Sequence, residues 1–436
     1  MEKTERAITH RAASSRNSVV HAPIFVFVIL LLSYLINTMD RNLFSILAVE
    51  IRTHLNLSLE EIGFAATVFT LGMGLAGLPT AWLFNKMPRK YVAIVGLIIF
   101  SAATVLTARS YGYADLLFYR FISGMGESIQ LIAVLSMATS YFHRHTAIAT
   151  GAINSMFGLG AIIGPNLSVV LLKGYDWQAP FAVFGAAGFV MVIVCLRFVT
   201  SEFSEFKPAS VRPVPRHHKK ESRLASTTST TWLLAAATAL GGLVIYAYLG
   251  LYPTFLRSHL GFSPREAAFA ASCYGAGGFL SLLCGWLGHR FGNRRILQIA
   301  LCVMSISGGL LFTPLGHSIY LHGLLSFIFG CMASGVLFAN FSSAIIHSIH
   351  PRISTSFGAS LFVSSFYIPA AFAGYILAVL TRHLGWVTGS SVMLVGGSIA
   401  ALVLVTLARN QQFGTAETTR HPNAGGESTA ETTYLH

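Results

Sequence analysis

Charged residues are scarce in this chain. They make up 10% of its 436 residues, while hydrophobic residues make up 54%; a soluble protein carries about 25% charged residues. Apolar runs of about 20 residues recur along the whole length, each long enough to cross a hydrocarbon core of roughly 30 Å. The composition therefore predicts a membrane protein with many spans and argues against a soluble globular class.

Motifs for covalent or metal chemistry are also missing. The five cysteines lie in apolar stretches without metal-ligand spacing and read as small buried hydrophobic residues: Cys195, Cys273, Cys284, Cys302 and Cys331. No nucleophile elbow, Gly-rich phosphate loop or His/Cys/Asp metal spacing stands beside an apolar run. We therefore expect neither an enzyme nor a bound metal or cofactor.

The net charge of +13 follows membrane topology and argues against nucleic-acid binding. With the N-terminus in the cytoplasm, 21 of the 29 Lys and Arg fall in cytoplasmic segments and six in external ones, the other two being Arg41 and Arg120. This asymmetry obeys the positive-inside rule. It predicts a multi-pass protein of a cell membrane, of the bacterial inner-membrane type, with both termini cytoplasmic.

The apolar runs divide the chain into two sets of six helices. We expect a cytoplasmic tail at 1–22 without a cleavage site, a first bundle at 23–200, a basic linker at 201–230, a second bundle at 231–409 and a disordered tail at 410–436. The twelve expected spans are 23–49, 60–84, 91–109, 113–141, 146–173, 178–200, 231–257, 264–288, 294–314, 318–346, 354–381 and 386–408.

The two halves repeat one another. The segment 54–61 (HLNLSLEE) matches 259–266 (HLGFSPRE) 205 residues later, and Pro165 and Pro369 stand 204 apart. Each feature falls at the same place within its half. The fold class we predict is an all-α membrane protein of twelve transmembrane helices in two pseudo-symmetric six-helix bundles.

Four ionisable residues stand within apolar helices of the first half. They are the adjacent Asp40 and Arg41, and Arg120 with Glu127 in a later helix. Each charge at a helix centre costs roughly 2.5–3.5 kcal/mol, so such residues face a partner or a water-filled cavity. Arg120 and Glu127 are about two turns apart on one face, too distant to pair with each other. We expect each to find its partner in the Asp40–Arg41 pair, either as a closed structural network or as a site for a charged substrate.

A loop motif gives the first family resemblance. The segment 285–295 (GWLGHRFGNRR) resembles the loop signature of the major facilitator superfamily, with His in place of the usual Asp, and 85–90 (NKMPRK) is a degenerate first copy. The basic residues of such loops can interact with carbonyl groups at helix C-termini. The resemblance marks as gating-loop residues Asn85, Lys86, Arg89, Lys90, His289, Arg290, Arg294 and Arg295.

Three further motifs resemble the anion:cation symporter family. They are Asn37–Arg41 in the first helix, Arg120 to Glu127 in the fourth and Tyr252–Leu256 closing the seventh. Members carry sugar acids, sialic acid, aromatic carboxylates or phosphate, many driven by protons. The resemblance implies that Arg41 and Arg120 meet the anion and that Asp40 and Glu127 couple to protons.

We therefore expect a monomeric importer that moves a small organic anion with protons across the lipid bilayer, powered by the proton gradient alone. Arg41 offers a planar fork for a carboxylate, and protonation of Glu127 or Asp40 would free an arginine to bind it. The second half has no ionised residue in mid-helix, and its hydroxyl and ring groups suit recognition of an organic anion. Beside the two arginines, the candidate substrate contacts are Asn154 of the first half and, in the second half, Tyr246, Asn340, Tyr274 and Ser364. Further polar side chains of the second half are Tyr248, Tyr252, His322, Ser365 and Tyr367.

The same motifs leave three other interpretations open. Spinster-like lipid carriers also show Asp-Arg in the first helix and Gly-x-Gly-Glu in the fourth, so export of a lipid or drug is the main alternative. A membrane enzyme conflicts with the missing catalytic motifs. A sensor conflicts with the short tails and the lack of a signalling domain.

Overall fold

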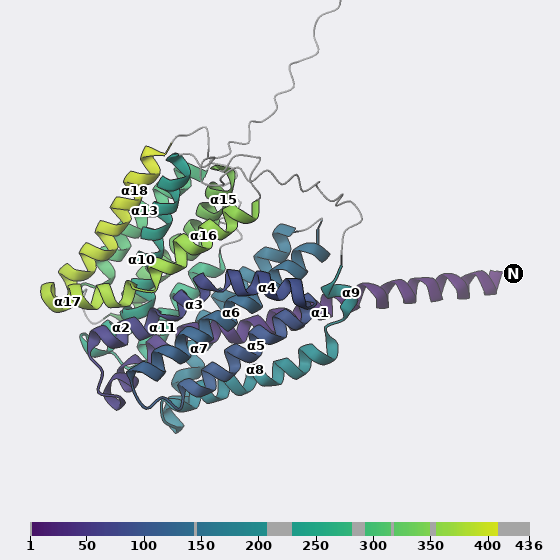
Figure 1. Cartoon of the computed structure of the whole chain (residues 1–436), viewed down its shortest axis with the longest axis horizontal. Coiled ribbons are helices and arrows are strands. Elements are labelled where there is room, and N and C mark those ends of the chain that lie inside the picture. Colours follow the sequence, from purple (N-terminus) through teal and green to yellow (C-terminus); the bar gives the residue numbers. More distant parts are fainter. Residues whose placement is uncertain are drawn as a thin grey trace, which may run out of the picture.

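The chain folds into helices, and the parts of it that the structure describes contain no strand. A computed structural model describes residues 2–143, 146–206, 229–280, 293–314, 318–348 and 355–408. Figure 1 shows two groups of helices, the first half of the chain lying below and to the right of the second. Residues 207–228 of the expected linker and the whole expected tail at 410–436 lie outside the described residues.

The first group begins with one long helix. α1 runs from Glu2 to His54 and therefore includes the segment expected as a tail, which projects from the group in Figure 1. The remaining helices of this group are α2 Leu59–Thr67, α3 Phe69–Leu75, α4 Gly77–Lys86, α5 Arg89–Thr107, α6 Tyr113–Tyr141, α7 Thr146–Gly174, α8 Gln178–Phe198 and the short α9 Ser201–Ser204.

The second group has the same plan with more breaks. Its helices are α10 Ser229–Ser258, α11 Pro264–Phe279, α13 Asn293–Leu311, α14 Ile319–Gly330, the π-helical η1 Cys331–Leu337, α15 Phe338–Ser348, α16 Thr355–Ala370, α17 Ala373–Ser390, the π-helical η2 Ser391–Gly396 and α18 Gly397–Leu407. Gly385 interrupts α17 with φ of 77°, a conformation that favours glycine. The chain turns back there, between the two last expected spans.

The described helices supply nine segments long and apolar enough to cross a membrane, or ten when α2 to α4 are joined across their 46° bend. One of the nine, Leu361–Leu407, contains the turn at Gly385 and so comprises two spans. With α11, whose described part has 16 residues, the total reaches the expected twelve.

The repeat is visible in local geometry. α2 and α11 both begin with a capping box: the Ser58 hydroxyl accepts from the Glu61 N–H at 3.1 Å, and Ser263 accepts from Glu266 at 3.3 Å. In each, the glutamate also accepts the backbone N–H of the serine, at 2.8 Å. The matched segments therefore start equivalent helices in the two halves.

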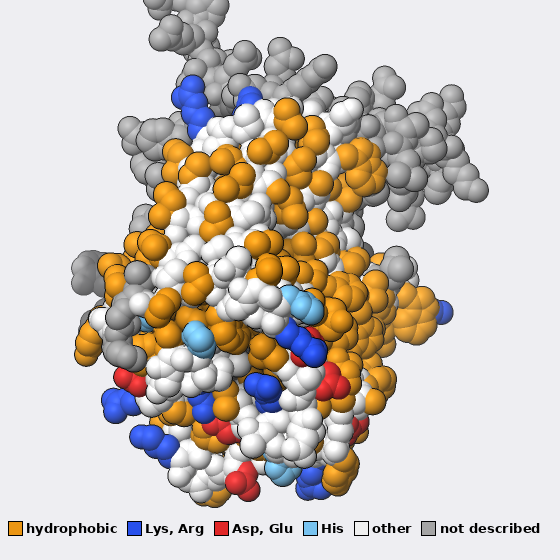
Figure 2. Space-filling model, turned by 90° about the vertical axis from the view of Figure 1, so that its left-hand side faces the viewer, with side chains coloured by type: hydrophobic (Ala, Val, Ile, Leu, Met, Phe, Trp, Pro, Cys, Tyr) orange, Lys and Arg blue, Asp and Glu red, His pale blue; other side chains and the backbone are white. Residues whose placement is uncertain are grey.

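The surface matches a bilayer environment. Large apolar side chains stand open on the outside, with Ile193 and Ile306 being 67% and 66% exposed. Figure 2 shows a face with charged side chains of both signs in its lower half, apolar side chains among uncharged ones above them, and Lys or Arg side chains at its upper edge. Contiguous apolar surface of this kind is suited to lipid.

Close packing within the first group positions the charged residues. Gly124 of α6 lies against the backbone of α3, where an added Cβ would sit 1.9 Å from the Phe69 carbonyl oxygen. Only glycine allows this approach. It brings Phe69 to the same region of α6 that carries Arg120 and Glu127.

Candidate functional site

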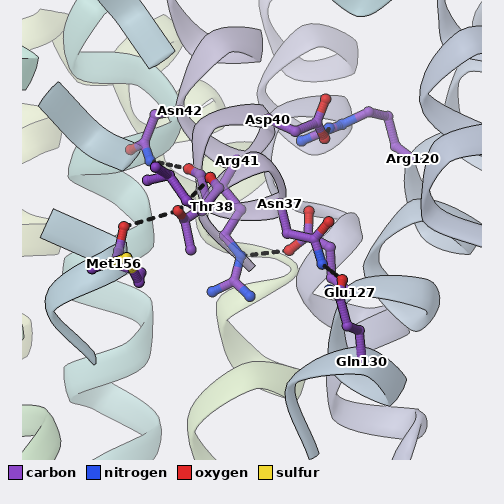
Figure 3. A network of polar contacts seen from close by, with 10 residues as sticks. Asn37, Thr38, Asp40, Arg41, Asn42, Arg120, Glu127, Gln130 and Met156 are labelled. Atoms are coloured by element: carbon purple, nitrogen blue, oxygen red, sulfur yellow. Dashed lines mark hydrogen bonds and ion pairs between the residues drawn. The ribbon is translucent and has the colours of Figure 1, made fainter. Parts of the chain in front are cut away.

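The four buried charges form two ion pairs between α1 and α6 (Figure 3). Arg41 Nε donates to Glu127 Oε2 at 2.5 Å, and Arg120 Nη1 donates to Asp40 Oδ2 at 3.1 Å. The four side chains are between 0% and 4% exposed. The expected cross-helix pairing of these residues is therefore confirmed, and buried charges paired in this way avoid much of the cost of desolvation.

The Arg120–Asp40 pair is enclosed by its own bundle. The guanidinium carbon of Arg120 lies 4.8 Å from the ring centre of Phe44 and 4.9 Å from that of Phe69. The guanidinium thus makes cation–π contacts with two aromatic rings of the first bundle. In this conformation Arg120 does not line the pocket described next, and its contact with substrate stays a prediction.

The Arg41–Glu127 pair lies beside a pocket between the bundles. Arg41 shares the lining with Phe157 of α7 and with Tyr246 and Leu249 of α10; the other lining residues are Asn42, Ser45, Ala66 and Phe69. Arg41 Nη2 has no hydrogen-bond partner among the described residues. One half of the guanidinium fork is therefore unpaired in this conformation.

The pocket is closed down in this conformation. It has a volume of about 10 Å³ for a water-sized occupant, which is near the minimum for one water molecule. An organic anion needs more room, so the bundles have to move apart locally before one can reach Arg41.

Aromatic side chains surround the Arg41 guanidinium. Its carbon lies 6.0 Å from the ring centre of Tyr34 and 5.9 Å from that of Phe157. Tyr246 and Tyr367 of the second bundle also lie near the guanidinium, with ring centres 6.2 Å apart. Sequence reasoning missed Tyr34 and Phe157, because aromatic residues in apolar helices carry no special signal; for Tyr34, the seven-residue spacing from Arg41 was the only hint.

Four other expected contacts do not line the pocket. Asn154 is exposed on α7, and Asn340 of α15 donates to the Val336 carbonyl of the preceding η1 at 2.8 Å. The Tyr274 hydroxyl is 2.7 Å from Ser334 Oγ inside the second bundle, and Ser364 is half-buried on α16. Their roles as ligands stay predictions.

The basic loop residues bind helix ends within their own bundle. Lys90 donates to the Leu196 carbonyl at 2.8 Å and Arg294 to the Thr406 carbonyl at 2.5 Å, both near helix C-termini. Arg89 donates to Ser140 Oγ at 2.7 Å. The expected interaction with C-terminal carbonyls is thus confirmed for these lysine and arginine side chains. Of the remaining loop residues, Asn85, Lys86 and Arg295 are exposed, and His289 and Arg290 lie outside the described residues.

Polar contacts join the two bundles at one end of the molecule, which we call the contact end. Arg257 of α10 donates to both carboxylate oxygens of Glu50, at 2.6 and 2.5 Å. Arg382 of α17 donates to Glu60 at 2.9 Å. These residues lie near helix ends, where a charge normally faces water, so no sequence pattern indicates that they pair across the bundles.

Helix backbones also meet at the contact end. The Thr67 hydroxyl donates to the Ala371 carbonyl at 2.7 Å. A Cβ added to Gly374 would lie 1.9 Å from the Gly63 carbonyl oxygen. Figure 1 shows the bundles diverging from this end towards α4 and α15. The described residues contain no group of three or more His, Cys, Asp or Glu side chains arranged to hold a metal ion.

Comparison with known proteins places this geometry in a family. The model of the Major Facilitator Superfamily matches residues 30–373. Three similar curated proteins are a probable sulfoacetate transporter of Cupriavidus necator (25% identity, 65% of this chain and 70% of that one), a 4-hydroxybenzoate transporter of Acinetobacter baylyi (24%, 71% and 74%) and a hexuronate transporter of Bacillus subtilis (23%, 60% and 63%).

A solved structure shares the fold. It is a bacterial homologue of the human lysosomal transporter Spinster in an inward-facing, unoccupied conformation, with 19% identity, a TM-score of 0.67, and coverage of 90% of this chain and 96% of that one. At this identity the likeness concerns the fold.

Proposed function

The chain belongs to the Major Facilitator Superfamily, and we propose that it is a proton-coupled importer of a small organic anion, most simply a monocarboxylate. One observation carries the proposal: Arg41 lines a pocket between the bundles and is paired with Glu127 through Nε, while its Nη2 has no hydrogen-bond partner among the described residues. An arginine in that state can exchange an internal carboxylate for an external one. The relatives that transport sulfoacetate, 4-hydroxybenzoate and hexuronate support an anionic cargo.

The exchange gives a mechanism. When Glu127 takes up a proton it loses its charge, and Arg41 is released to bind a carboxylate with its planar fork. When the proton leaves, Glu127 again competes for Arg41 and the anion is expelled. Proton and anion thus favour the same states, which is the thermodynamic requirement for symport. Asp40 and Glu127 can share the proton, because closely interacting groups titrate as a set.

Charge balance sets a stoichiometry. The four side chains sum to zero, and the enclosed Arg120–Asp40 pair remains neutral as a unit. One proton on Glu127 leaves one positive charge on Arg41, which one monoanion neutralises. We therefore assign one proton to each monoanion.

Membrane orientation follows from the positive-inside rule. The contact end carries loops poor in Lys and Arg, so we assign it to the external side and both termini to the cytoplasm. With its external side joined by the Glu50–Arg257 and Glu60–Arg382 pairs, this conformation is closed towards the outside, and local opening of the pocket would admit substrate from the cytoplasm.

The test is uptake into proteoliposomes under an inward proton gradient, with sulfoacetate, 4-hydroxybenzoate and a hexuronate as probes. We expect gradient-driven uptake of at least one probe. Arg41→Ala should abolish binding, and Glu127→Gln should abolish accumulation but retain exchange. The exposed Arg109→Ala and Glu202→Gln are matched controls and should behave as wild type. Wild-type uptake indifferent to both the gradient and competing anions would defeat the proposal, and stimulation by lysolipid alone would support lipid export.

A further inference from the structure

A row of polar side chains continues from the Arg41–Glu127 pair along the interface of α1 and α6. Asn37 donates through Nδ2 to Gln130 Oε1, Gln130 donates through Nε2 to Ser33 Oγ at 2.9 Å, and Ser33 donates to the Leu30 carbonyl at 2.8 Å. Asn37, Gln130 and Ser33 are at most 1% exposed. Burying such a row of polar groups in an apolar interface costs free energy unless each group has a hydrogen-bond partner.

The order of donors fixes the orientation of both amides. Because the Ser33 hydroxyl gives its hydrogen to Leu30, it accepts from the amino group of Gln130. Gln130 therefore turns its oxygen to Asn37, and Asn37 turns its amino group to Gln130. The remaining atom, Asn37 Oδ1, is buried and can only accept a hydrogen bond.

Two buried acceptors then lack a donor. Neither Asn37 Oδ1 nor Glu127 Oε1 has a hydrogen-bond partner among the described residues. Asn37 lies one turn before Arg41 on α1, and Gln130 lies three residues after Glu127 on α6, so the two cross-helix contacts are neighbours. Figure 3 shows the Asn37–Gln130 and Arg41–Glu127 contacts in the same part of the interface between α1 and α6. Leaving a buried acceptor unsatisfied costs about 1–3 kcal/mol.

A proton on Glu127 would supply the missing donor. The other ionisable groups near this carboxylate are Asp40, Arg41 and Tyr34 from α1, Arg120 from α6, Tyr246 from α10 and Tyr367 from α16. None of them donates to Asn37 Oδ1 or Glu127 Oε1. Only a protonated carboxyl converts one of the two acceptors into a donor for the other.

We propose that Asn37 is a positioning residue for proton coupling: its Oδ1 accepts a hydrogen bond from protonated Glu127, and Gln130 and Ser33 hold the amide in the orientation this requires. The inference rests on the proposed proton symport and deepens it. The hydrogen bond stabilises neutral Glu127, which is the state that releases Arg41 for the anion. A purely structural clamp between α1 and α6 would not depend on the protonation of Glu127.

The test is an infrared pH titration of the purified full-length protein, with the proton itself as the ligand. The band of a protonated carboxyl is assigned to Glu127 by its loss in Glu127→Gln. We expect Asn37→Leu to move this band to higher frequency and to lower its pH midpoint by about one pH unit, a tenfold change in protonation equivalent to about 1.4 kcal/mol. Gln130→Met and Ser33→Ala should shift both in the same direction by less, and they provide the answer if Asn37→Leu does not fold.

Thr107→Val is the matched control, because Thr107 is buried on α5 and its hydroxyl donates only to the Ala103 carbonyl of its own helix. It should leave band and midpoint unchanged. If Asn37→Leu leaves the band and its pH midpoint unchanged, the role of Asn37 is overturned while symport stands. If Asn37→Leu does not fold, the same result in both Gln130→Met and Ser33→Ala overturns it. A wild-type protein without any Glu127 band across the accessible pH range would overturn both.

Discussion

Replacing Gly374 by alanine should shift the protein away from the conformation that is closed at the contact end. In this structure a Cβ on Gly374 would lie 1.9 Å from the Gly63 carbonyl oxygen, whereas ordinary contacts begin at 3.4 Å. The two backbones would have to separate by the difference, about 1.5 Å. The new Cβ is fixed to its own backbone, and the atom that it meets is a backbone oxygen of Gly63. No flexible side chain can therefore move aside to make room.

The size of the effect follows from overpacking. Inserting a methyl group into a filled site costs about 1–3 kcal/mol, and here the cost applies only to the conformation in which the bundles touch. The equilibrium between conformations should therefore move by about 5-fold to 150-fold. Gly63→Ala should act similarly but less strongly, since its Cβ would lie 2.5 Å from the Gly374 carbonyl oxygen.

The assay is labelling of a pocket residue from the side of the contact end. Ser45→Cys, in a background without other cysteines, places a thiol in the pocket lining. A membrane-impermeant reagent should label it at least fivefold faster when Gly374→Ala is added. Gly396→Ala is the control, because nothing lies within 4 Å of a Cβ at that position. Equal labelling rates in Gly374→Ala and Gly396→Ala would refute the reasoning.

Three further predictions follow from the same geometry. Glu50→Gln should also speed labelling from the contact end, but by less than tenfold, because the Glu50–Arg257 ion pair is partly exposed and screened by solvent. Added salt should reduce the difference in labelling rate from wild type. Arg120→Ala should lower the free energy of unfolding by about 3–5 kcal/mol in a thermal or denaturant assay, since it leaves Asp40 charged and buried. A pH gradient of one unit should raise accumulation of a monoanion up to about tenfold, while a potential of about 100 mV, worth 2.3 kcal/mol for each charge moved, should leave it unchanged.

The sequence predicted the scaffold because hydropathy and charge asymmetry report directly on the bilayer. The breaks inside helices were harder to foresee. The second expected span bends between α3 and α4 near Ala76. The eleventh expected span ends at residue 381, whereas α17 continues as helix to the turn at Gly385. The positions of these breaks depend on packing between helices, and the sequence indicates such packing only by one or two glycines.

The partners of the buried charges could be predicted, since few ionisable groups were available to each. The contact end could not. Glu50 and Arg257 are 207 residues apart, and each stands near the end of an apolar run, where topology alone explains a charge. Their pairing depends on how two separately folded bundles meet, and no local pattern encodes that.

The two buried pairs show why the environment decides what a charged motif does. Both join an arginine to a carboxylate across α1 and α6, and their side chains are almost equally buried. Arg120 lies against Phe44 and Phe69 of its own bundle and does not line the pocket in this conformation. Arg41 faces α7 and α10, whose relative position changes when the bundles move. The pair that we propose to exchange its carboxylate is therefore the one that lies against the other half of the chain.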